Sequence, residues 1–200
     1  TMLKQITNIP IYFLLLLFIS SPSFSDWTLV NEKSKLNFTS TKASDIKEVH
    51  SFKTLSGNVT EKGKALININ ISSVETLIPI RNERMKNLLF QAEIYPSASF
   101  RLKIKLDKIL LMEKGDSFVN KYNGQLELKG KQFPLEIEIK TTRLDDQSFS
   151  VVSNQPLILN AKKLGLATGV ESLRAVAGLP SISNSVPVTF SLIFLKKEKF

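Results

Sequence analysis

The stretch from Val74 to Phe100, VETLIPIRNERMKNLLFQAEIYPSASF, determines how the rest of this chain is interpreted. Strand-like segments flank it on both sides, and its own pattern is that of a short helix inserted between two strands. Asn82 is a candidate N-cap, because its side chain can accept a hydrogen bond from an unpaired backbone N–H at a helix start. Three apolar residues follow at helical spacing and would share one face: Met85, Leu88 and Leu89. The stretch therefore predicts a helix from Asn82 to about Phe90.

Apolar and polar residues alternate on both sides of this helix, which is the pattern of half-buried β-strands. Before it, the isoleucines of residues 67–71 alternate with polar residues, and after it the alternation runs from Ala98 to Leu106. Residues 42–48 are polar and are predicted to form a connecting loop. Residues 160–185 break the strand pattern and contain a second helical stripe, formed by Val170, Leu173, Val176 and Ala177. In total the chain predicts roughly eight strands with hairpin-like spacing, which favours antiparallel pairing.

Two folds fit this pattern. Eight antiparallel strands can close into a barrel without open edges, and the interior of such a barrel can hold one small ligand. A sandwich of two sheets would give the same periodicity, so the alternation alone does not distinguish the two.

Several short motifs resemble the signature of the YceI-like family. They are Thr76, the Arg81-Asn-Glu-Arg-Met cluster, Phe90, Tyr95-Pro96-x-x-x-Phe100, Gly124-Gln-Leu-Glu-Leu-Lys-Gly130, Leu164-Gly165-Leu166 and Val186-Pro-Val-Thr-Phe190. Members of that family are bacterial, mostly periplasmic proteins whose lipocalin-like antiparallel barrel binds a polyisoprenoid or another long-chain lipid. The resemblance extends over residues 27–195. It implies an all-β fold, an eight-stranded antiparallel lipocalin-like β-barrel with two short helical insertions.

The alternation also predicts which residues would face an apolar lumen. We expect this lumen to be lined by Phe38, Ile69, Ile71, Phe100, Leu102, Ile104, Tyr122, Leu126, Leu128, Leu135, Ile137, Phe190 and Leu192. The helix would cover one opening through Met85, Leu88, Leu89 and Phe90. Arg81 and Arg84 are candidates for holding an anionic headgroup, because the arginine fork suits carboxylate and phosphate. The simpler alternatives are a filled core and two solvated arginines.

Residues 1–25 have the pattern of a secretory signal peptide, which leaves residues 26–200 as one YceI-like domain. Lys4 supplies a basic start, Ile11 to Ile19 is an apolar run too short to span a bilayer, and Ser23 and Ser25 fit a cleavage site. We therefore expect a periplasmic protein exported by a cleavable signal peptide. The alternative is an uncleaved membrane anchor.

Composition argues against an enzyme. The chain has no cysteine and a single histidine, His50, so thiol catalysis and a Cys- or His-rich metal site are excluded. Glu136 and Glu138 share a strand face, but they alternate with core residues and are interpreted as solvated.

We expect no cofactor except a bound isoprenoid or fatty-acyl lipid, and no nucleic-acid partner. The net charge of +9 suits an anionic membrane surface, where Arg101, Lys103 and Lys105 could make transient contact. A homodimer is left open, and a structural or interaction protein of the cell envelope is the alternative function.

Overall fold

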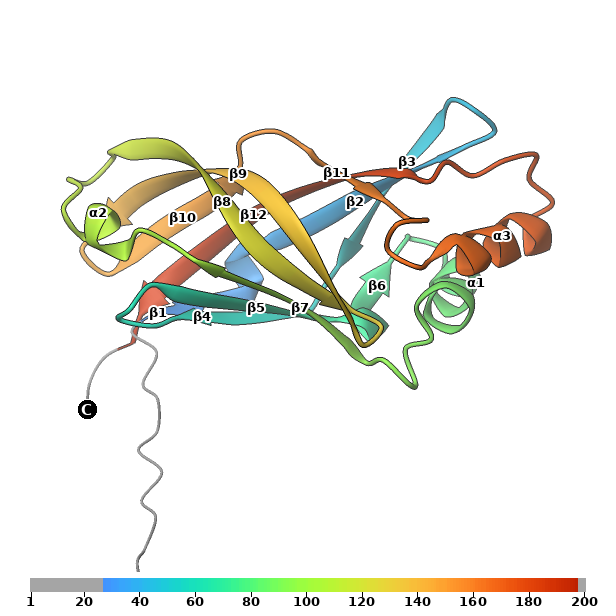
Figure 1. The fold of residues 1–200 in the computed structure, drawn as a ribbon, viewed down its shortest axis with the longest axis horizontal. Coiled ribbons are helices and arrows are strands. Elements are labelled where there is room, and N and C mark those ends of the chain that lie inside the picture. Colours follow the sequence, from blue (N-terminus) through green and yellow to red (C-terminus); the bar gives the residue numbers. More distant parts are fainter. Residues whose placement is uncertain (1–26, 198–200) are drawn as a thin grey trace, which may run out of the picture.

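The computed structural model describes residues 27–197, and the predicted signal peptide lies outside the described residues (Figure 1). Within this range the strands form one sheet. The strands are β1 (Trp27–Leu29), β2 (Lys35–Lys42), β3 (Ile46–Phe52), β4 (Leu55–Val59), β5 (Lys64–Asn70), β6 (Val74–Glu75), β7 (Ser97–Lys103), β8 (Ser117–Leu128), β9 (Lys131–Asp145), β10 (Ser148–Ser153), β11 (Leu157–Asn160) and β12 (Ser185–Lys196).

The sheet closes into a barrel, as predicted. Hydrogen-bonded neighbours follow the order β1-β4-β5-β7-β8-β9-β10-β12, and β1 pairs back onto β12 through Thr28 and Leu195. Every pairing is antiparallel, and half of these pairs join strands that are consecutive in the chain. The eight-stranded antiparallel barrel is therefore confirmed, and the sandwich is not formed.

Some of the barrel's strands are made of two pieces. The first half of β12 pairs with β2 and β11, and its second half pairs with β1 and β10. A 3₁₀ turn at Asn31–Lys33 separates β1 from β2, and residues 154–156 separate β10 from β11. These interruptions let the wall continue past the closed ring, which lengthens the barrel toward one end.

Helices lie at both ends of this barrel (Figure 1). At one end are α1 (Pro79–Arg84), which continues directly into the π-helix η3 (Met85–Phe90), and α3 (Ala167–Val176). At the opposite end is α2 (Leu106–Leu110), a further helix that was not predicted and that begins where the predicted strand ends. Leu106 and Ile109 are both buried, and their spacing of three places them on one face of a helical turn. The last apolar residue of the alternation thus belongs to a helix that packs against this end of the barrel.

The start of the first helix differs from the prediction. Ile78 is the N-cap and Pro79 occupies the first helical turn, where a residue without an N–H and with a fixed φ is well suited. Asn82 is inside the helix, so it is not the N-cap. Its side chain instead reaches back to Thr76, with the Asn82 Oδ1 atom accepting hydrogen bonds from the Thr76 backbone N–H at 2.8 Å and hydroxyl at 2.6 Å.

An aromatic cluster fills the end of the barrel where β1 lies. The Trp27 ring meets the Phe149 ring edge-on at 4.8 Å, and Phe149 stacks on Phe194 at 5.1 Å. The Arg143 guanidinium lies 5.4 Å from the Trp27 ring and donates a hydrogen bond to the Asp146 carbonyl at 2.8 Å. Trp27 and Phe149 are almost fully buried, so this end is packed shut. No helix among residues 27–197 has the length and apolar character needed to cross a bilayer.

Candidate functional site

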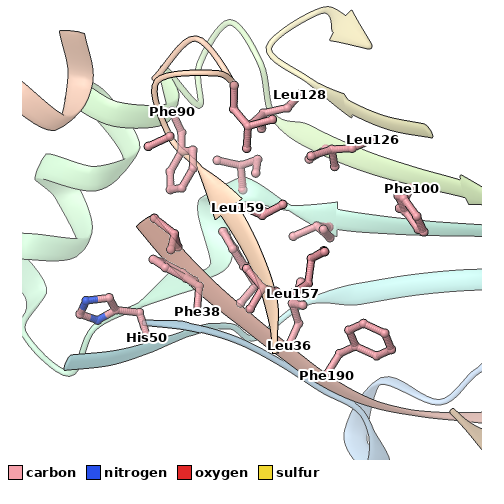
Figure 2. Close-up of a pocket in the computed structure, with 18 of the residues that line it drawn as sticks. Leu36, Phe38, His50, Phe90, Phe100, Leu126, Leu128, Leu157, Leu159 and Phe190 are labelled. Atoms are coloured by element: carbon pink, nitrogen blue, oxygen red, sulfur yellow. The ribbon is translucent and has the colours of Figure 1, made fainter. Parts of the chain in front are cut away.

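The barrel encloses a cavity of about 600 Å³ that extends to the end covered by α1, η3 and α3 (Figure 2). This volume lies within the range of cavities that bind small molecules. Figure 2 shows aliphatic and phenylalanine side chains from strands far apart in the sequence pointing into one space, among them Leu36, Leu126, Leu157 and Phe190. The core of the barrel is therefore not filled by its own side chains.

Almost every residue predicted to face the lumen lines this cavity. Those that do are Phe38, Ile69, Ile71, Phe100, Leu102, Ile104, Leu126, Leu128, Leu135, Ile137, Phe190 and Leu192. Gly124 helps to shape the wall, because a Cβ there would lie 2.3 Å from the Phe100 ring. The glycine thus leaves room for that ring to lie across β8.

Tyr122 does not line the cavity, which corrects the prediction. Its side chain faces inward and is buried, but it belongs to the same core cluster as Leu106 and Ile109 of α2. Alternation predicts the face of a strand on which a residue lies, and not its height along the barrel. Tyr122 lies at the height that α2 closes, so its ring is packed among other side chains.

Three of the four residues predicted to cover the lumen line the cavity. These are Met85, Leu89 and Phe90, whereas Leu88 does not line it and is 36% exposed. The cause is the π-helical turn, in which backbone hydrogen bonds join residues five apart and the winding is wider than in an α-helix. Residues four and five positions after Met85 therefore align with it, and the residue three positions after it turns outward.

A second helix also covers the cavity, and the sequence did not indicate this role. The stripe on α3 formed by Val170, Leu173, Val176 and Ala177 lines the cavity. Gly169 allows the close approach of α3 to η3, since a Cβ there would lie 2.7 Å from the Leu88 carbonyl oxygen and 2.7 Å from the Leu89 Cα. The two helices together form one cover.

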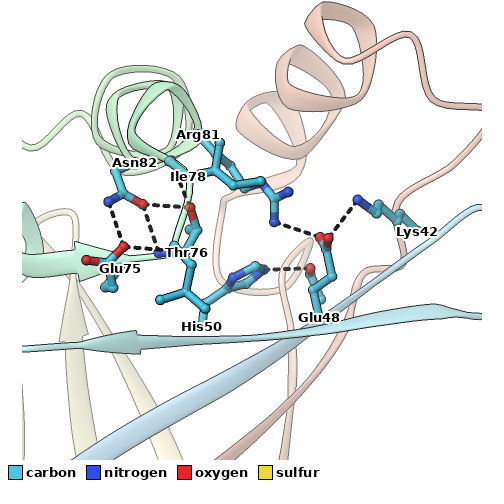
Figure 3. A network of polar contacts seen from close by, with 10 residues as sticks. Lys42, Glu48, His50, Glu75, Thr76, Ile78, Arg81 and Asn82 are labelled. Atoms are coloured by element: carbon cyan, nitrogen blue, oxygen red, sulfur yellow. Dashed lines mark hydrogen bonds and ion pairs between the residues drawn. The ribbon is translucent and has the colours of Figure 1, made fainter.

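Charged and polar residues gather at the covered end of the cavity (Figure 3). Glu48 accepts from Arg81 at 2.8 Å and pairs with Lys42 at 2.9 Å. Burial acts to raise the pKa of Glu48, yet the hydrogen bond from Lys42 and the charge of Arg81 bring it below its ordinary value. Arg84 follows Arg81 by one turn of helix and lines the same cavity. Both predicted headgroup candidates therefore lie at the cavity.

His50 is the buried polar residue of this end. It is 2% exposed, its Nε2 atom is 2.8 Å from the Ser40 hydroxyl, and its ring packs against Phe38 at 5.2 Å. Burial holds the pKa of His50 below its ordinary value, and the charge of Arg81 lowers it further. The imidazole is therefore neutral at neutral pH.

Lys42 and Glu48 were not predicted to line the cavity, because residues 42–48 were interpreted as a loop. In the structure β2 continues to Lys42 and β3 begins at Ile46, so the segment is a tight hairpin. Glu48 and His50 are two apart on β3 and share its inner face. An alternating pattern read through the polar residues would have placed both on the cavity side.

A separate network anchors α1 to the sheet (Figure 3). The Glu75 carboxylate accepts from the Asn82 amide at 3.0 Å and the Leu77 backbone N–H at 2.7 Å, and it pairs with Lys53. Asn82 in turn accepts from Thr76. These contacts hold Leu77 in the left-handed region at φ 63°, which is uncommon for a leucine. The start of α1 is thereby fixed over the cavity.

The Glu75 network should make stability depend on pH. Hydrogen bonds from Asn82, then from Lys53 and the Leu77 N–H, lower the pKa of Glu75 to about 2 from 4.5. A carboxyl with a depressed folded-state pKa stabilises the fold above its unfolded pKa, and this contribution is lost as the pH falls through the folded value. Urea unfolding should show Glu75→Gln less stable than the unmodified protein above about pH 4.5, with the difference vanishing toward pH 2. A difference independent of pH would contradict this assignment.

The comparisons with known proteins agree with this architecture. The family model described as the YceI-like domain matches residues 27–194. The chain belongs to the YceI-like family. No curated protein sequence matches it. The predicted resemblance is therefore confirmed over nearly the whole described range.

Several solved structures share the fold. A polyisoprenoid binding domain from Saccharophagus degradans, implicated in plant cell wall breakdown, is 30% identical with a TM-score of 0.85, over 87% of this chain and 100% of that domain. BcnA from Burkholderia cenocepacia is 18% identical with a TM-score of 0.64, over 82% and 98% of the two chains. The YceI protein of Campylobacter jejuni is 17% identical with a TM-score of 0.50, over 74% and 85%. The last two similarities concern the fold alone.

Proposed function

We propose that this protein binds one long-chain hydrophobic ligand, a polyisoprenoid or a fatty-acyl lipid, inside the barrel and acts as a carrier without catalysis. The observation that carries the proposal is the cavity of about 600 Å³ with an apolar wall. The similar domain from Saccharophagus degradans, described as polyisoprenoid binding, supports the same class of ligand. Glu136 and Glu138, the paired carboxylates of the sequence, do not line this cavity, which fits a binding protein.

The chemistry of the wall favours unbroken hydrocarbon. Burial of each methylene contributes about 0.8 kcal/mol, so roughly ten buried methylenes would supply about 8 kcal/mol before association costs are subtracted. A polar group placed along the chain would lose its hydrogen bonds to water and find no partner on an aliphatic wall. Affinity should therefore rise with chain length until the cavity is full.

Native mass spectrometry of the purified protein, followed by organic extraction, tests this function directly. We expect a co-purifying long-chain species. Delipidated protein is then titrated with a homologous series of fatty acids, and the dissociation constant should fall with each added methylene. Affinity that does not change with chain length would contradict binding inside the cavity.

We also propose that the mature protein acts in the periplasm and begins at Asp26. The basis is the signal-peptide pattern of residues 1–25, with Lys4, the apolar run and the Ser23/Ser25 pair. A carrier outside the cytoplasm would shield a lipid from water between two membrane surfaces.

The cover should contribute to binding through Leu89 and not through Leu88. Leu89→Asp would place a charge on the cavity wall and should weaken lipid affinity about tenfold, because a carboxylate is costly beside hydrocarbon. Leu88→Asp is the matched control on the exposed side of the same turn and should change affinity less than twofold. Affinity is measured by titration, and far-UV circular dichroism checks that the sheet persists in both variants. Equal effects of the two substitutions would contradict the cover.

A further inference from the structure

We infer that the covered end of the cavity is a headgroup site for an oxyanion, a carboxylate or phosphate monoester at the end of the hydrocarbon chain, bound by His50 and Arg84. This inference rests on the proposed function, since the headgroup belongs to the same ligand. The inference adds two properties to the proposed ligand: a negatively charged headgroup at one end, and a fixed direction in which the ligand enters the barrel.

The first observation is an unsatisfied atom. His50 is 2% exposed and lines the cavity, and its Nδ1 atom has no hydrogen-bond partner among residues 27–197. A buried polar atom without a partner costs free energy that a ligand can recover by pairing with it. Because Ser40 occupies Nε2, only Nδ1 is left for a ligand. When the Ser40 hydroxyl donates to Nε2, the neutral ring carries its proton on Nδ1 and donates to an acceptor oxygen.

The second observation is the excess of positive charge. Lys42, Arg81, Arg84 and Glu48 all line the cavity, which gives three cations and one carboxylate. Glu48 is shared by Lys42 and Arg81. Arg84 forms no ion pair or side-chain hydrogen bond within the described part of the chain. Its guanidinium is therefore available, and its planar fork binds carboxylate or phosphate in a bidentate manner.

The third observation is that the polar groups are concentrated at one end. Ser40, His50 and Ser183 also line the cavity near the Lys42–Glu48–Arg81 group. Ser183 is held beside β2 by a hydrogen bond from its backbone N–H to the Thr41 carbonyl at 2.8 Å. Toward the opposite end the wall is formed by residues such as Phe149 and Phe194, with Thr141 as the polar exception. A ligand with one charged terminus would therefore bind with its chain toward the Trp27 cluster and its headgroup beneath α1.

The test compares three probes with the same saturated chain: hexadecanoate, hexadecyl phosphate and hexadecanol. Each is titrated, below its micelle concentration, into delipidated wild type, His50→Phe, Arg84→Gln and Arg101→Gln. Phenylalanine keeps a ring beside Phe38 but removes Nδ1. Arg101→Gln is the matched control, because it removes the same charge from the outer wall, where Arg101 pairs with Glu127.

Wild type should bind at least one of the two oxyanions about tenfold or more tightly than the alcohol, as expected for hydrogen bonds to a charged group. The same comparison shows whether carboxylate or phosphate is preferred. His50→Phe and Arg84→Gln should each reduce this preference to about threefold or less, while Arg101→Gln leaves it unchanged. Tight binding of all three probes with no preference would overturn the headgroup site and leave the proposed function standing. Failure of every probe to bind would overturn both.

Discussion

Leu159→Trp is expected to lower the affinity for a long-chain ligand by about 100-fold. Leu159 is on β11 and lines the cavity near its middle (Figure 2). An indole at this position would occupy space that the hydrocarbon chain needs. Exclusion of roughly four methylenes removes about 3 kcal/mol of binding free energy, which corresponds to about two orders of magnitude in the dissociation constant. Titration of the fatty-acid series should also show that the gain with chain length stops at a shorter chain.

Ile158→Trp provides the matched control for this substitution. Ile158 is the preceding residue of the same strand, but it is 60% exposed and does not line the cavity. The same increase in side-chain size on the outer face should leave the affinity within about twofold of wild type. If both variants bind equally well, the ligand does not occupy the barrel. If both lose binding equally, distortion of β11 and not occupation of the cavity would be the cause.

The inner face of the wall was predictable from the sequence because strand geometry leaves little freedom. Side chains alternate between the two faces of a strand, and a closed barrel has one inside. Ile69, Leu126 and Ile137 are in phase with their neighbours and all line the cavity. The fold itself needed more than periodicity, because a sandwich has the same alternation, and the family motifs decided for the barrel.

Other features depend on information that alternation does not carry. Tyr122 has the inward phase of its strand, but its height places it against α2, a helix that begins at Leu106, the last apolar residue of the predicted strand. Leu88 has α-helical spacing from Met85, but the local π-turn changes which residues align. Both errors come from local backbone geometry that is set by packing of the ends of the barrel.

The polar end of the cavity was harder to predict, because its residues are unlike their surroundings. Lys42 and Glu48 lie in the segment that was interpreted as a solvated loop. Only the pairing of β2 with β3 brings them together with Ser40, His50 and Arg81 beneath α1. Polar residues on an inner face interrupt the apolar pattern by which strands are recognised. A binding site for a headgroup will therefore tend to be concealed from pattern analysis, while the apolar wall around it is evident.

Trp27 at the closed end should be the largest single contributor to stability among the residues that do not line the cavity. It is 1% exposed, contacts Phe149 edge-on at 4.8 Å and lies 5.4 Å from the Arg143 guanidinium. Its backbone is also part of the closure, because Trp27 pairs with Val59 on one side and Lys196 on the other. The indole does not line the cavity, but it packs against Phe149, which does and which stacks on Phe194.

Trp27→Ala is expected to lower the free energy of unfolding by about 3–5 kcal/mol, as is typical when a buried aromatic residue is truncated and leaves a void. The midpoint of thermal unfolding should fall by roughly 6–20 °C. Since Trp27 is the only tryptophan of the chain, far-UV circular dichroism and not intrinsic fluorescence must follow the unfolding. Trp27→Phe should lose less, because a ring still meets Phe149. Thr28→Ala, at the exposed neighbouring position of β1, should change stability by no more than about 0.5 kcal/mol. A loss below about 1 kcal/mol for Trp27→Ala would show that the closed end of the barrel does not depend on the Trp27 indole for its stability.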